Sequence, residues 1–499
     1  MLDIVSCESM RKSDLATIEG GVPGVTLMWR AGMGIYESVR WHGRVGIVCG
    51  SGNNAGDGYA LALILKENNI DATLILLKNK FSADGEYYYK RCQNVSIKTI
   101  FYNEDTPLDF DIIVDCILGT GFSGELSPEI CEVIEKINSS DAYVVSADIN
   151  SGLNGDNGLC KIAVKSDITV SIGTRKTGHY LAMAQDYIKK LVNVDIGIEI
   201  IEPPYHLIEK ADIKKCFKER KHFSNKGTYG YTALIGGCME YSGAVKLASL
   251  ALSSLKVGAG VSKLATSRSI CPTIMPSLLE VTLYPLDDQN GYIMYNPTQI
   301  DGALKGVKAV AIGMGMGEGA QAYEIICHIL KKYEMPVIID ADGLNALSRG
   351  DINILKETKC TIILTPHPKE LERLCGVSVE EILKNPIEIA RRFAKEYGVI
   401  LLLKGASTIV TDGREVYIIN RGCAGMATAG SGDVLSGVLL GICSQNNEPS
   451  EQLLNTCAGA FVNGVAGEMA QSELCSVSMT ASDTVAKLPM TIKSILENE

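Results

Sequence analysis

Short runs of apolar residues, each ending in a polar or glycine-rich turn, recur along the chain and alternate with helix-like stretches. In the first half these runs predict strands at residues 45–49, 72–77, 111–116, 143–147, 168–172 and 191–194. Helical patterns cover residues 59–66 and 128–137. Strands that alternate with helices in this way predict a parallel sheet with helices on both faces.

The alternation begins again in the second half. Apolar runs predict strands at residues 231–235, 309–312, 336–339, 362–364 and 399–403, a long helix over 242–257 and an apolar helix over 434–443. Between the halves lie Pro203, Pro204 and a charged stretch at 209–221, a composition typical of a linker or a solvated helix. We therefore predict an α/β protein with two three-layer α/β/α domains, residues 1–212 and 213–499.

Composition and charge narrow the classes of function. With 499 residues the chain is too long for a single core. Its net charge of -11 argues against nucleic acid as a partner, because phosphate backbones are bound by basic surfaces. The 16 cysteines show no metal-binding spacing, which favours reduced thiols in a cytoplasmic protein. The sequence has no secretory leader pattern and no apolar run of about 18 residues, so we expect no membrane contact.

Three loops in the first half leave predicted strands with glycines and acidic or amide side chains. They span residues 53–57, 115–125 and 148–151. Ligands of parallel sheets bind beyond the carboxyl ends of the strands, so we expect these loops to form one crevice. Each loop alone has an ordinary alternative, because Asn and Asp form turns and the first loop lacks the GxGxxG spacing. Oxygen ligands without His or Cys favour a hard cation over zinc.

The second half carries a small-residue turn, Ala429 to Asp433, directly before an apolar helix. Backbone N–H groups of such a turn, together with the positive end of the helix, suit a phosphate group. A carboxylate beside them could deprotonate a hydroxyl that attacks phosphorus, although Asp433 could equally be a helix cap. Polar residues at other strand ends, including His367 and Lys404, should gather around this turn. The sequence has no Walker A motif.

These motifs carry a family resemblance over nearly the full length of the chain. TPHPKE, KGAST, DADGLNAL and AGSGD resemble the ADP/ATP-dependent NAD(P)H-hydrate dehydratases, which have a ribokinase-like fold. NNAGDG, VDCILGTGFSGELSPE and DINSG resemble the NAD(P)H-hydrate epimerase domain, which is Rossmann-like. The fused chain is therefore similar to the bifunctional nicotinamide nucleotide repair enzymes. Ala55, Asn150 and Asn463 depart from the usual residues of that family.

The resemblance implies one site for each domain. In the epimerase, Asp148 would be catalytic, and Asn54, Asp115 and Ser151 would bind potassium. The residues that would hold the dinucleotide hydrate there are Asn53, Asn54, Ala55, Gly56, Asp57, Gly119, Thr120, Gly121, Phe122, Ser123, Gly124, Glu125 and Asp148. In the dehydratase, which would also use Mg²⁺, the hydrate would be held by Ala244, Gly315, His367 and Asp433. The residues that would hold ADP or ATP are Lys404, Gly405, Ala406, Ser407, Thr408 and Gly432.

The implied chemistry is repair of hydrated nicotinamide dinucleotides, NADHX and NADPHX. The R and S hydrates would be epimerised, and the S hydrate dehydrated to NAD(P)H at the expense of ADP or ATP, with release of AMP and phosphate. Phosphoryl transfer to the ring hydroxyl would create a good leaving group, and Asp433 would take the hydroxyl proton. The alternative is a hydroxymethylpyrimidine or sugar kinase with an accessory binding domain. We also expect a homo-oligomer.

Overall fold

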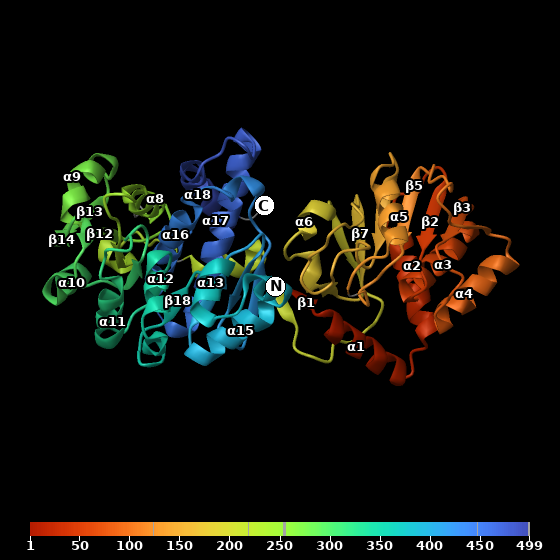
Figure 1. Ribbon diagram of the computed structural model, residues 1–499, viewed down its shortest axis with the longest axis horizontal. Helices are drawn as coiled ribbons and strands as arrows, with labels where there is room; N and C mark the ends of the chain where they lie inside the picture. Colours follow the sequence, from red (N-terminus) through yellow and green to blue (C-terminus); the bar gives the residue numbers. More distant parts are fainter. Residues whose placement is uncertain (123, 218, 253–255, 447, 498–499) are drawn as a thin grey trace. The chain divides into compact units, whose positions relative to one another are not determined.

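In the computed structural model, the chain forms two units, each built around its own sheet (Figure 1). The structure describes residues 1–122, 124–217, 219–252, 256–446 and 448–497. One unit comprises Asp3–Tyr205, and the other comprises His206–Glu499 with Met1–Leu2. Residues 206–212 thus belong to the second unit, whereas the sequence analysis assigns them to the first domain. Where the two activities divide stays a prediction.

The sheet of the first unit has seven parallel strands in the order β4-β3-β2-β5-β6-β7-β9. These strands are β2 (Val45–Cys49), β3 (Ala72–Leu76), β4 (Lys98–Phe101), β5 (Ile112–Cys116), β6 (Tyr143–Ala147), β7 (Ile168–Ile172) and β9 (Leu191–Val194). The six predicted strands are confirmed, and β4 is added at the edge. A separate parallel pair joins β1 (Leu2–Val5) to β8 (Arg175–Lys176).

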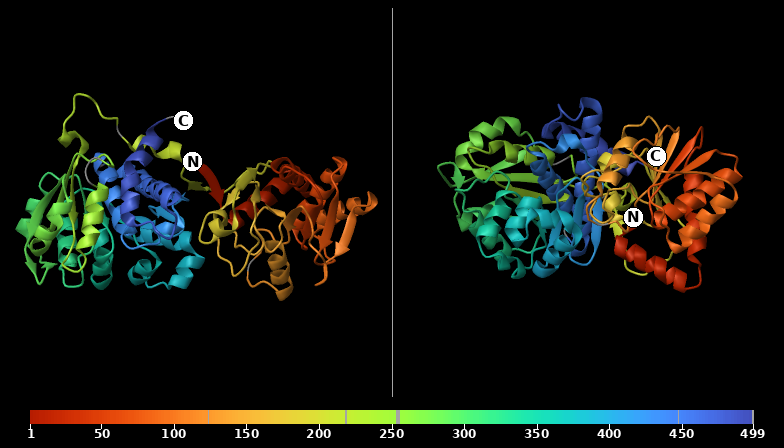
Figure 2. Two further views of the ribbon diagram at one scale, coloured as in Figure 1. Left: turned by 90° about the horizontal axis from the view of Figure 1, so that it is seen from above. Right: turned by 45° about the vertical axis from the view of Figure 1, so that its right-hand side comes forward.

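Helices cover both faces of this sheet (Figure 2). They are α1 (Cys7–Glu19), α2 (Gly24–Ser38), α3 (Asn53–Glu67), α4 (Ala83–Asn94), α5 (Pro128–Asn138), α6 (Ala184–Tyr187) and the 3₁₀ turn η1 (Thr177–His179). One face buries apolar residues of α2 and α3, and the opposite face buries Val133, Ile134 and Ile137 of α5. This arrangement confirms the predicted three layers.

Helix α3 begins six residues earlier than its apolar pattern predicts. The segment from Asn53 to Gly58, expected as a loop, forms its first turns. Its weak helix formers are compensated by packing, since Ala55 is buried and a methyl group on Gly56 would lie 2.5 Å from the Met28 sulfur. The predicted binding loop is therefore a helix N-terminus, whose free N–H groups face the carboxyl end of the sheet.

The sheet of the second unit runs β13-β12-β11-β16-β17-β18-β19-β20-β21-β10. Neighbouring strands are parallel except for the β19–β20 and β20–β21 pairs. The strands are β10 (Tyr205–Leu207), β11 (Tyr231–Ile235), β12 (Val261–Ser267), β13 (Val281–Leu286), β16 (Ala309–Ile312), β17 (Val337–Ile339), β18 (Ile362–Leu364), β19 (Ile400–Leu403), β20 (Thr408–Thr411) and β21 (Val416–Ile419). A short hairpin joins β14 (Asp288–Gln289) and β15 (Tyr292–Ile293).

Helices again form two layers. They are α7 (Lys210–Ile213), α8 (Ser242–Leu252), α9 (Cys271–Ile274), α10 (Pro297–Leu304), α11 (Ala322–Lys332), α12 (Asp342–Arg349), α13 (Pro368–Cys375), α14 (Val379–Lys384), α15 (Pro386–Tyr397), α16 (Ser431–Gln445), α17 (Gln452–Leu474) and α18 (Ala481–Leu496). Helix α16 is buried from Val434 to Gln445, and it packs against α8 and α17. Of the helix predicted over 242–257, the described part ends at Leu252, residues 253–255 lie outside the described residues, and 256–257 are not helical.

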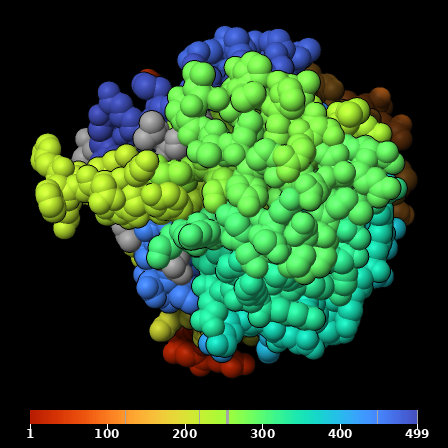
Figure 3. Space-filling model, turned by 90° about the vertical axis from the view of Figure 1, so that its left-hand side faces the viewer, coloured from red at the N-terminus to blue at the C-terminus, as the bar shows by residue number. Residues whose placement is uncertain are grey.

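The stretch predicted as a linker or solvated helix has a mixed character. Ile213 and Cys216 are buried in the core of the second unit, which anchors its beginning. Residues 219–228 are all exposed. In Figure 3 this part of the chain, in yellow-green, stands out from the surrounding surface. Among the described residues, no helix combines the length and apolarity needed to cross a membrane.

Candidate active sites

Asp115, near the end of β5, is the centre of a buried polar network in the first unit. Its carboxylate accepts hydrogen bonds from the Ser151 hydroxyl, the Ser151 backbone N–H at 2.8 Å, the Ser146 hydroxyl at 3.0 Å and the Ile117 N–H at 3.2 Å. Burial raises the pKa of Asp115, and these hydrogen bonds oppose that shift. The predicted pairing of Asp115 with Ser151 is present in the structure.

Asn54 completes this group from the start of α3. Its side-chain N–H₂ donates to the Leu118 carbonyl at 2.8 Å, and the Ser151 hydroxyl lies 3.2 Å from the same oxygen. The Asn54 side-chain oxygen is buried and has no hydrogen-bond partner. A buried carbonyl oxygen without a donor is costly, and it is the kind of atom that a hard cation binds. The structure therefore brings together the three residues predicted to bind potassium.

Asp148 follows β6 and is held on two sides. Its φ is +63°, a left-handed conformation that is rare outside glycine. The Lys176 ammonium, which is fully buried, donates to its carboxylate and to the Ile172 carbonyl at 2.7 Å. His179 accepts the Lys176 backbone N–H through Nδ1 at 3.0 Å, so its proton is on Nε2, 2.8 Å from the Asp148 carbonyl oxygen.

Lys176, His179 and Asp14 are site residues that sequence reasoning missed. Burial lowers the pKa of His179 to about 4, with Lys176 adding to the effect, so its imidazole is neutral. Burial also raises the pKa of Asp57 and Asp14, and the charge of Asp148 adds to both shifts. Lys176 does follow a predicted strand, β7, but no local pattern shows which residue it will meet.

The glycine-rich loop after β5 meets this group at one end. A methyl group on Gly119 would lie 3.2 Å from the Asn54 Cβ, so backbone and side chain are already in contact there. Gly121 and Gly124 have open space around them. Glu125, predicted to bind substrate, is exposed and pairs with Lys161 at 2.6 Å. Ser123, also predicted to bind substrate, lies outside the described residues.

The second site surrounds the N-terminus of α16. The buried Asp340, after β17, accepts hydrogen bonds from Lys404 Nζ at 2.9 Å and from the Ser436 hydroxyl at 2.7 Å. Burial opposes both charges of the Asp340–Lys404 pair, yet their attraction outweighs it. The pKa of Asp340 is lowered and that of Lys404 is raised. Gly432 adjoins the pair, since a methyl group there would lie 3.5 Å from Nζ.

Asp433 is partly buried beside this pair. Its pKa is raised to about 7, first by burial and then by the negative charges of Asp340 and Asp342, while Lys404 opposes the shift. A carboxyl group with a pKa near neutrality is ionised in a large fraction of molecules at physiological pH, and its carboxylate form binds a proton readily. The geometry therefore gives Asp433 the properties of a general base, in addition to its place at a helix start.

One further predicted residue, His367, lies at the rim of this site. His367 is half exposed and caps α13, because its Nδ1 accepts the backbone N–H groups of Lys369 and Glu370. Burial, with Lys404 and Arg373 adding their charges, lowers its pKa. Glu370, not predicted, is buried with its carboxylate 3.7 Å from Lys404 Nζ.

Gly315 and Ala244 form a close contact between β16 and α8. The φ of Gly315 is +59°, and a Cβ there would lie 2.9 Å from the Ala244 Cβ and 2.6 Å from the Tyr241 carbonyl. Of the nucleotide segment, Lys404 faces Asp340, whereas the Ser407 hydroxyl donates to the Asn420 side chain at 2.9 Å. Gly405 and Ala406 lie between β19 and β20, and Thr408 is the first residue of β20.

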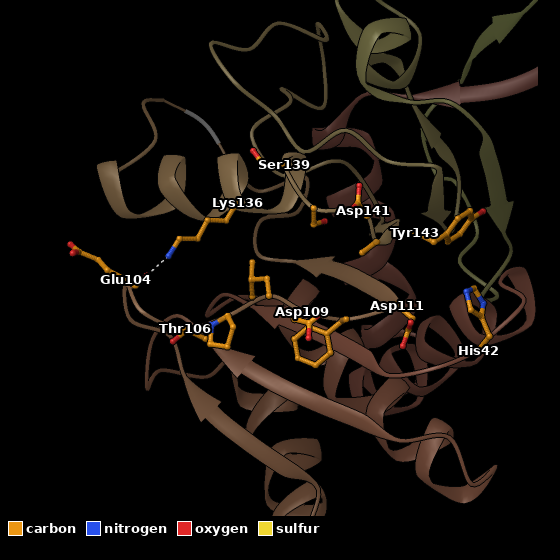
Figure 4. A pocket seen from close by; sticks show the side chains of 14 residues that line it. His42, Glu104, Thr106, Asp109, Asp111, Lys136, Ser139, Asp141 and Tyr143 are labelled. Atoms are coloured by element: carbon orange, nitrogen blue, oxygen red, sulfur yellow. Dashed lines mark hydrogen bonds between the residues drawn. The ribbon is translucent and has the colours of Figure 1, made fainter.

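A cavity of the first unit lies away from Asp115 and Asp148. It has a volume of about 910 Å³, and its lining includes His42, Asp111, Lys136 and Tyr143 (Figure 4). His42 and Asp111 precede strands of the first unit and Tyr143 begins one, so the cavity opens at the amino ends of the strands, opposite to Asp115 and Asp148. No group of three or more His, Cys, Asp or Glu among the described residues is arranged to hold a metal ion.

Comparison with known families covers both units. Residues 232–490 match the family described as NAD(P)H-hydrate dehydratase, and residues 25–178 match the YjeF-related protein N-terminus. A bifunctional NAD(P)H-hydrate repair enzyme of Moorella thermoacetica is 31% identical, and the alignment covers 99% of this chain and 97% of that protein. Another of the same description, from Dictyoglomus turgidum, is 31% identical with coverages of 99% and 98%.

A solved structure resembles the second unit. The ADP/ATP-dependent NAD(P)H-hydrate dehydratase of Bacillus subtilis, co-crystallised with ATP/Mg²⁺, is 28% identical, with a TM-score of 0.50. The alignment covers 58% of this chain and 99% of that one. A protein of Streptococcus mutans is 25% identical with a TM-score of 0.51 and coverages of 58% and 100%. The predicted α/β class and ribokinase-like second domain are thereby confirmed.

Proposed function

The chain belongs to the family of bifunctional NAD(P)H-hydrate repair enzymes, and from this membership we propose how its two units divide the work. The first unit epimerises the R and S hydrates of NADH and NADPH. The second dehydrates the S hydrate to NAD(P)H, with ADP or ATP as co-substrate and AMP and phosphate as the products from ADP. The alternative, a plain small-molecule kinase, has less support, because it does not explain the family match over residues 25–178.

The observation that carries the dehydratase assignment is Asp433 beside the Asp340–Lys404 pair. Asp433, whose pKa is raised to about 7, takes the proton of the ring hydroxyl as that oxygen attacks the terminal phosphoryl group. The Lys404 ammonium and the N–H groups at the start of α16 stabilise the charge on the transferred phosphoryl. Gly315, Ala244 and His367 hold the hydrate, and residues 404–408 with Gly432 hold the adenine nucleotide.

Mg²⁺ accompanies the nucleotide in this proposal. The dehydratase of Bacillus subtilis was crystallised with ATP/Mg²⁺. Because Mg²⁺ keeps several waters and is usually held by one or two carboxylates and the substrate phosphates, an all-protein cage is not needed. We assign this role to Asp340 and Asp342, whose negative charges both raise the pKa of Asp433.

The epimerase assignment includes a potassium ion. The unpartnered side-chain oxygen of Asn54, the Asp115 carboxylate and the Ser151 hydroxyl form an oxygen-only set that fits a hard monovalent cation. When bound, K⁺ supplies positive charge that balances Asp115 and orients the substrate phosphates. The N-terminus of α3, from Asn53 to Asp57, and residues 119–125 hold the dinucleotide around Asp148.

One experiment tests both activities on the full chain. Purified protein is incubated with a mixture of R- and S-NADHX, and the hydrates and nucleotides are separated by chromatography. Without nucleotide, the two epimers should interconvert; with ADP or ATP, both should be consumed and NADH should appear. A panel of sugars and hydroxymethylpyrimidine tests the kinase alternative. Phosphorylation of a panel compound, with NADHX unchanged, would overturn the proposal.

A further inference from the structure

Asp148 is held by hydrogen bonds at two places by one short segment, residues 172–179, which begins at the last residue of β7. The Lys176 ammonium and the Ile172 N–H, at 3.2 Å, both donate to the Asp148 carboxylate. His179 donates through Nε2 to the Asp148 backbone carbonyl. Residue 148 therefore has both its side chain and its backbone fixed, in a left-handed conformation that is rare outside glycine.

The charge of Lys176 is buried as well as fixed. Its side chain is 0% exposed, whereas that of Asp148 is 15% exposed, so the carboxylate reaches the site and the ammonium does not. A buried ammonium is tolerated when a carboxylate pairs with it, and the Asp148 carboxylate does so here.

Further charged and titratable groups surround Asp148. Cys7 and Asp14, from the start and middle of α1, and Asp57, from α3, are each influenced by its charge. Arg175 and Lys176 also act on His179, which is neutral. The surroundings are therefore acidic on the helix side and basic on the β8 side.

We propose that Lys176 and His179 are positioning residues for the epimerase, which hold Asp148 as an oriented carboxylate so that it can serve only as the base of the reaction. This inference rests on the proposed function of the first unit. Neither residue touches substrate, because Lys176 is fully buried and His179 is 3% exposed. The proton donor must then be another group of the site.

Lys176→Met removes the ammonium and keeps the length of the side chain. We expect the kcat of epimerisation to fall on the order of 10²-fold with little change in KM, because a misplaced or protonated base acts on the chemical step. The acidic limb of the pH profile should move to higher pH, because the variant lacks the ammonium that pairs with the carboxylate. His179→Gln, which keeps a donor near Nε2, should retain more activity than His179→Leu.

Lys189→Met is the matched control, because Lys189 forms an exposed ion pair with Asp167 at 3.2 Å in the same unit. Lys189→Met should leave the rate of epimerisation and its pH profile unchanged. ADP-dependent dehydration should be unchanged in every variant. A folded Lys176→Met protein with the wild-type pH profile would overturn the inference.

If Lys176→Met does not fold, the double variant Asp148→Asn/Lys176→Met decides. Removal of both charges should restore the melting temperature without restoring epimerisation. A double variant as unstable as the single variant would contradict the proposed role of the Asp148–Lys176 ion pair. Wild-type protein that fails to epimerise would instead overturn the proposed function.

Discussion

Asp433 occupies the third position of α16, where a side chain can cap the helix and also face a bound phosphate. Replacement by Asn preserves size and capping ability, so melting should change little. Loss of the proton acceptor should lower dehydration of the S hydrate by about 10²–10⁴-fold. The rate is measured with purified S-NADHX and saturating nucleotide. Epimerisation by the same protein is the internal control, and a near wild-type dehydration rate would make Asp433 a cap only.

The raised pKa of Asp433 also predicts a pH dependence. Because the base must be ionised, dehydration should rise with pH to a plateau above about 7, the pKa of that carboxyl. The same shift makes the folded state bind the proton more tightly than the unfolded state. The stability gained is therefore complete below the ordinary pKa of 3.8 and is lost as pH rises through about 7.

Asp340→Asn tests the cause of that shift. It removes a neighbouring negative charge and frees Lys404 to interact with Asp433, and both effects lower the Asp433 pKa. The acidic limb of dehydration should therefore move to lower pH, which is measured on the S hydrate between pH 5 and 8, roughly the span in which a perturbed carboxyl of this kind titrates. A limb that stays in place would assign the shift to burial alone.

Single residues were predictable where they follow an apolar strand directly. Lys404 and His367 were identified this way, whereas Asp433 was identified from the small-residue turn before an apolar helix. The structure places Lys404 beside Asp340 and Glu370, and both Lys404 and Asp340 influence the pKa of Asp433. Asp340 itself stood in a recognised motif but gave no sign of pairing with Lys404, which is 64 positions away. Lys176 was missed for a similar reason, because an ion pair between separate strands leaves no trace in a local pattern.

At the scale of elements, the close contact between β16 and α8 depends on Gly315. Gly315→Ala places a methyl group against the Tyr241 carbonyl and Ala244, in a left-handed backbone that costs about 1–3 kcal/mol for other residues. We expect a higher KM for the hydrate with a smaller change for the nucleotide. Gly376→Ala is the matched control, since its φ is +71° but nothing lies within 4 Å. Equal effects of the two variants on KM would remove Gly315 from the pocket.

Six of the seven strands described in the first sheet and five of the ten described in the second were predicted, because buried parallel strands appear as short continuous apolar runs. Two of the differences have clear physical reasons. Strand β4 carries exposed and half-buried residues only, so it lacks an apolar run. The start of α3 was read as a loop because its Asn and Gly residues have low helix propensity, which packing against Met28 overrides. The four residues of β20 contain no pattern that predicts its antiparallel direction.

At the scale of the whole molecule, each unit has its own sheet, core and candidate site. We therefore predict that residues 1–205, expressed alone, epimerise the hydrates without nucleotide, and that residues 206–499 dehydrate only the S hydrate. Chromatography of R and S hydrates over time measures both. Loss of both activities on separation would show that the units depend on each other.

The unpartnered oxygen of Asn54 has a consequence for the protein without any substrate. An ion that binds the folded chain and not the unfolded chain raises the free energy of unfolding by RT ln(1 + [L]/Kd), about 2.7 kcal/mol at one hundred times Kd. The melting temperature should therefore rise with potassium concentration and respond less to an equal concentration of a larger organic cation. In Asp115→Ala this difference should vanish. Melting curves recorded at several potassium concentrations thus measure binding of the ion. The potassium content of the purification buffer therefore affects the stability of the first unit.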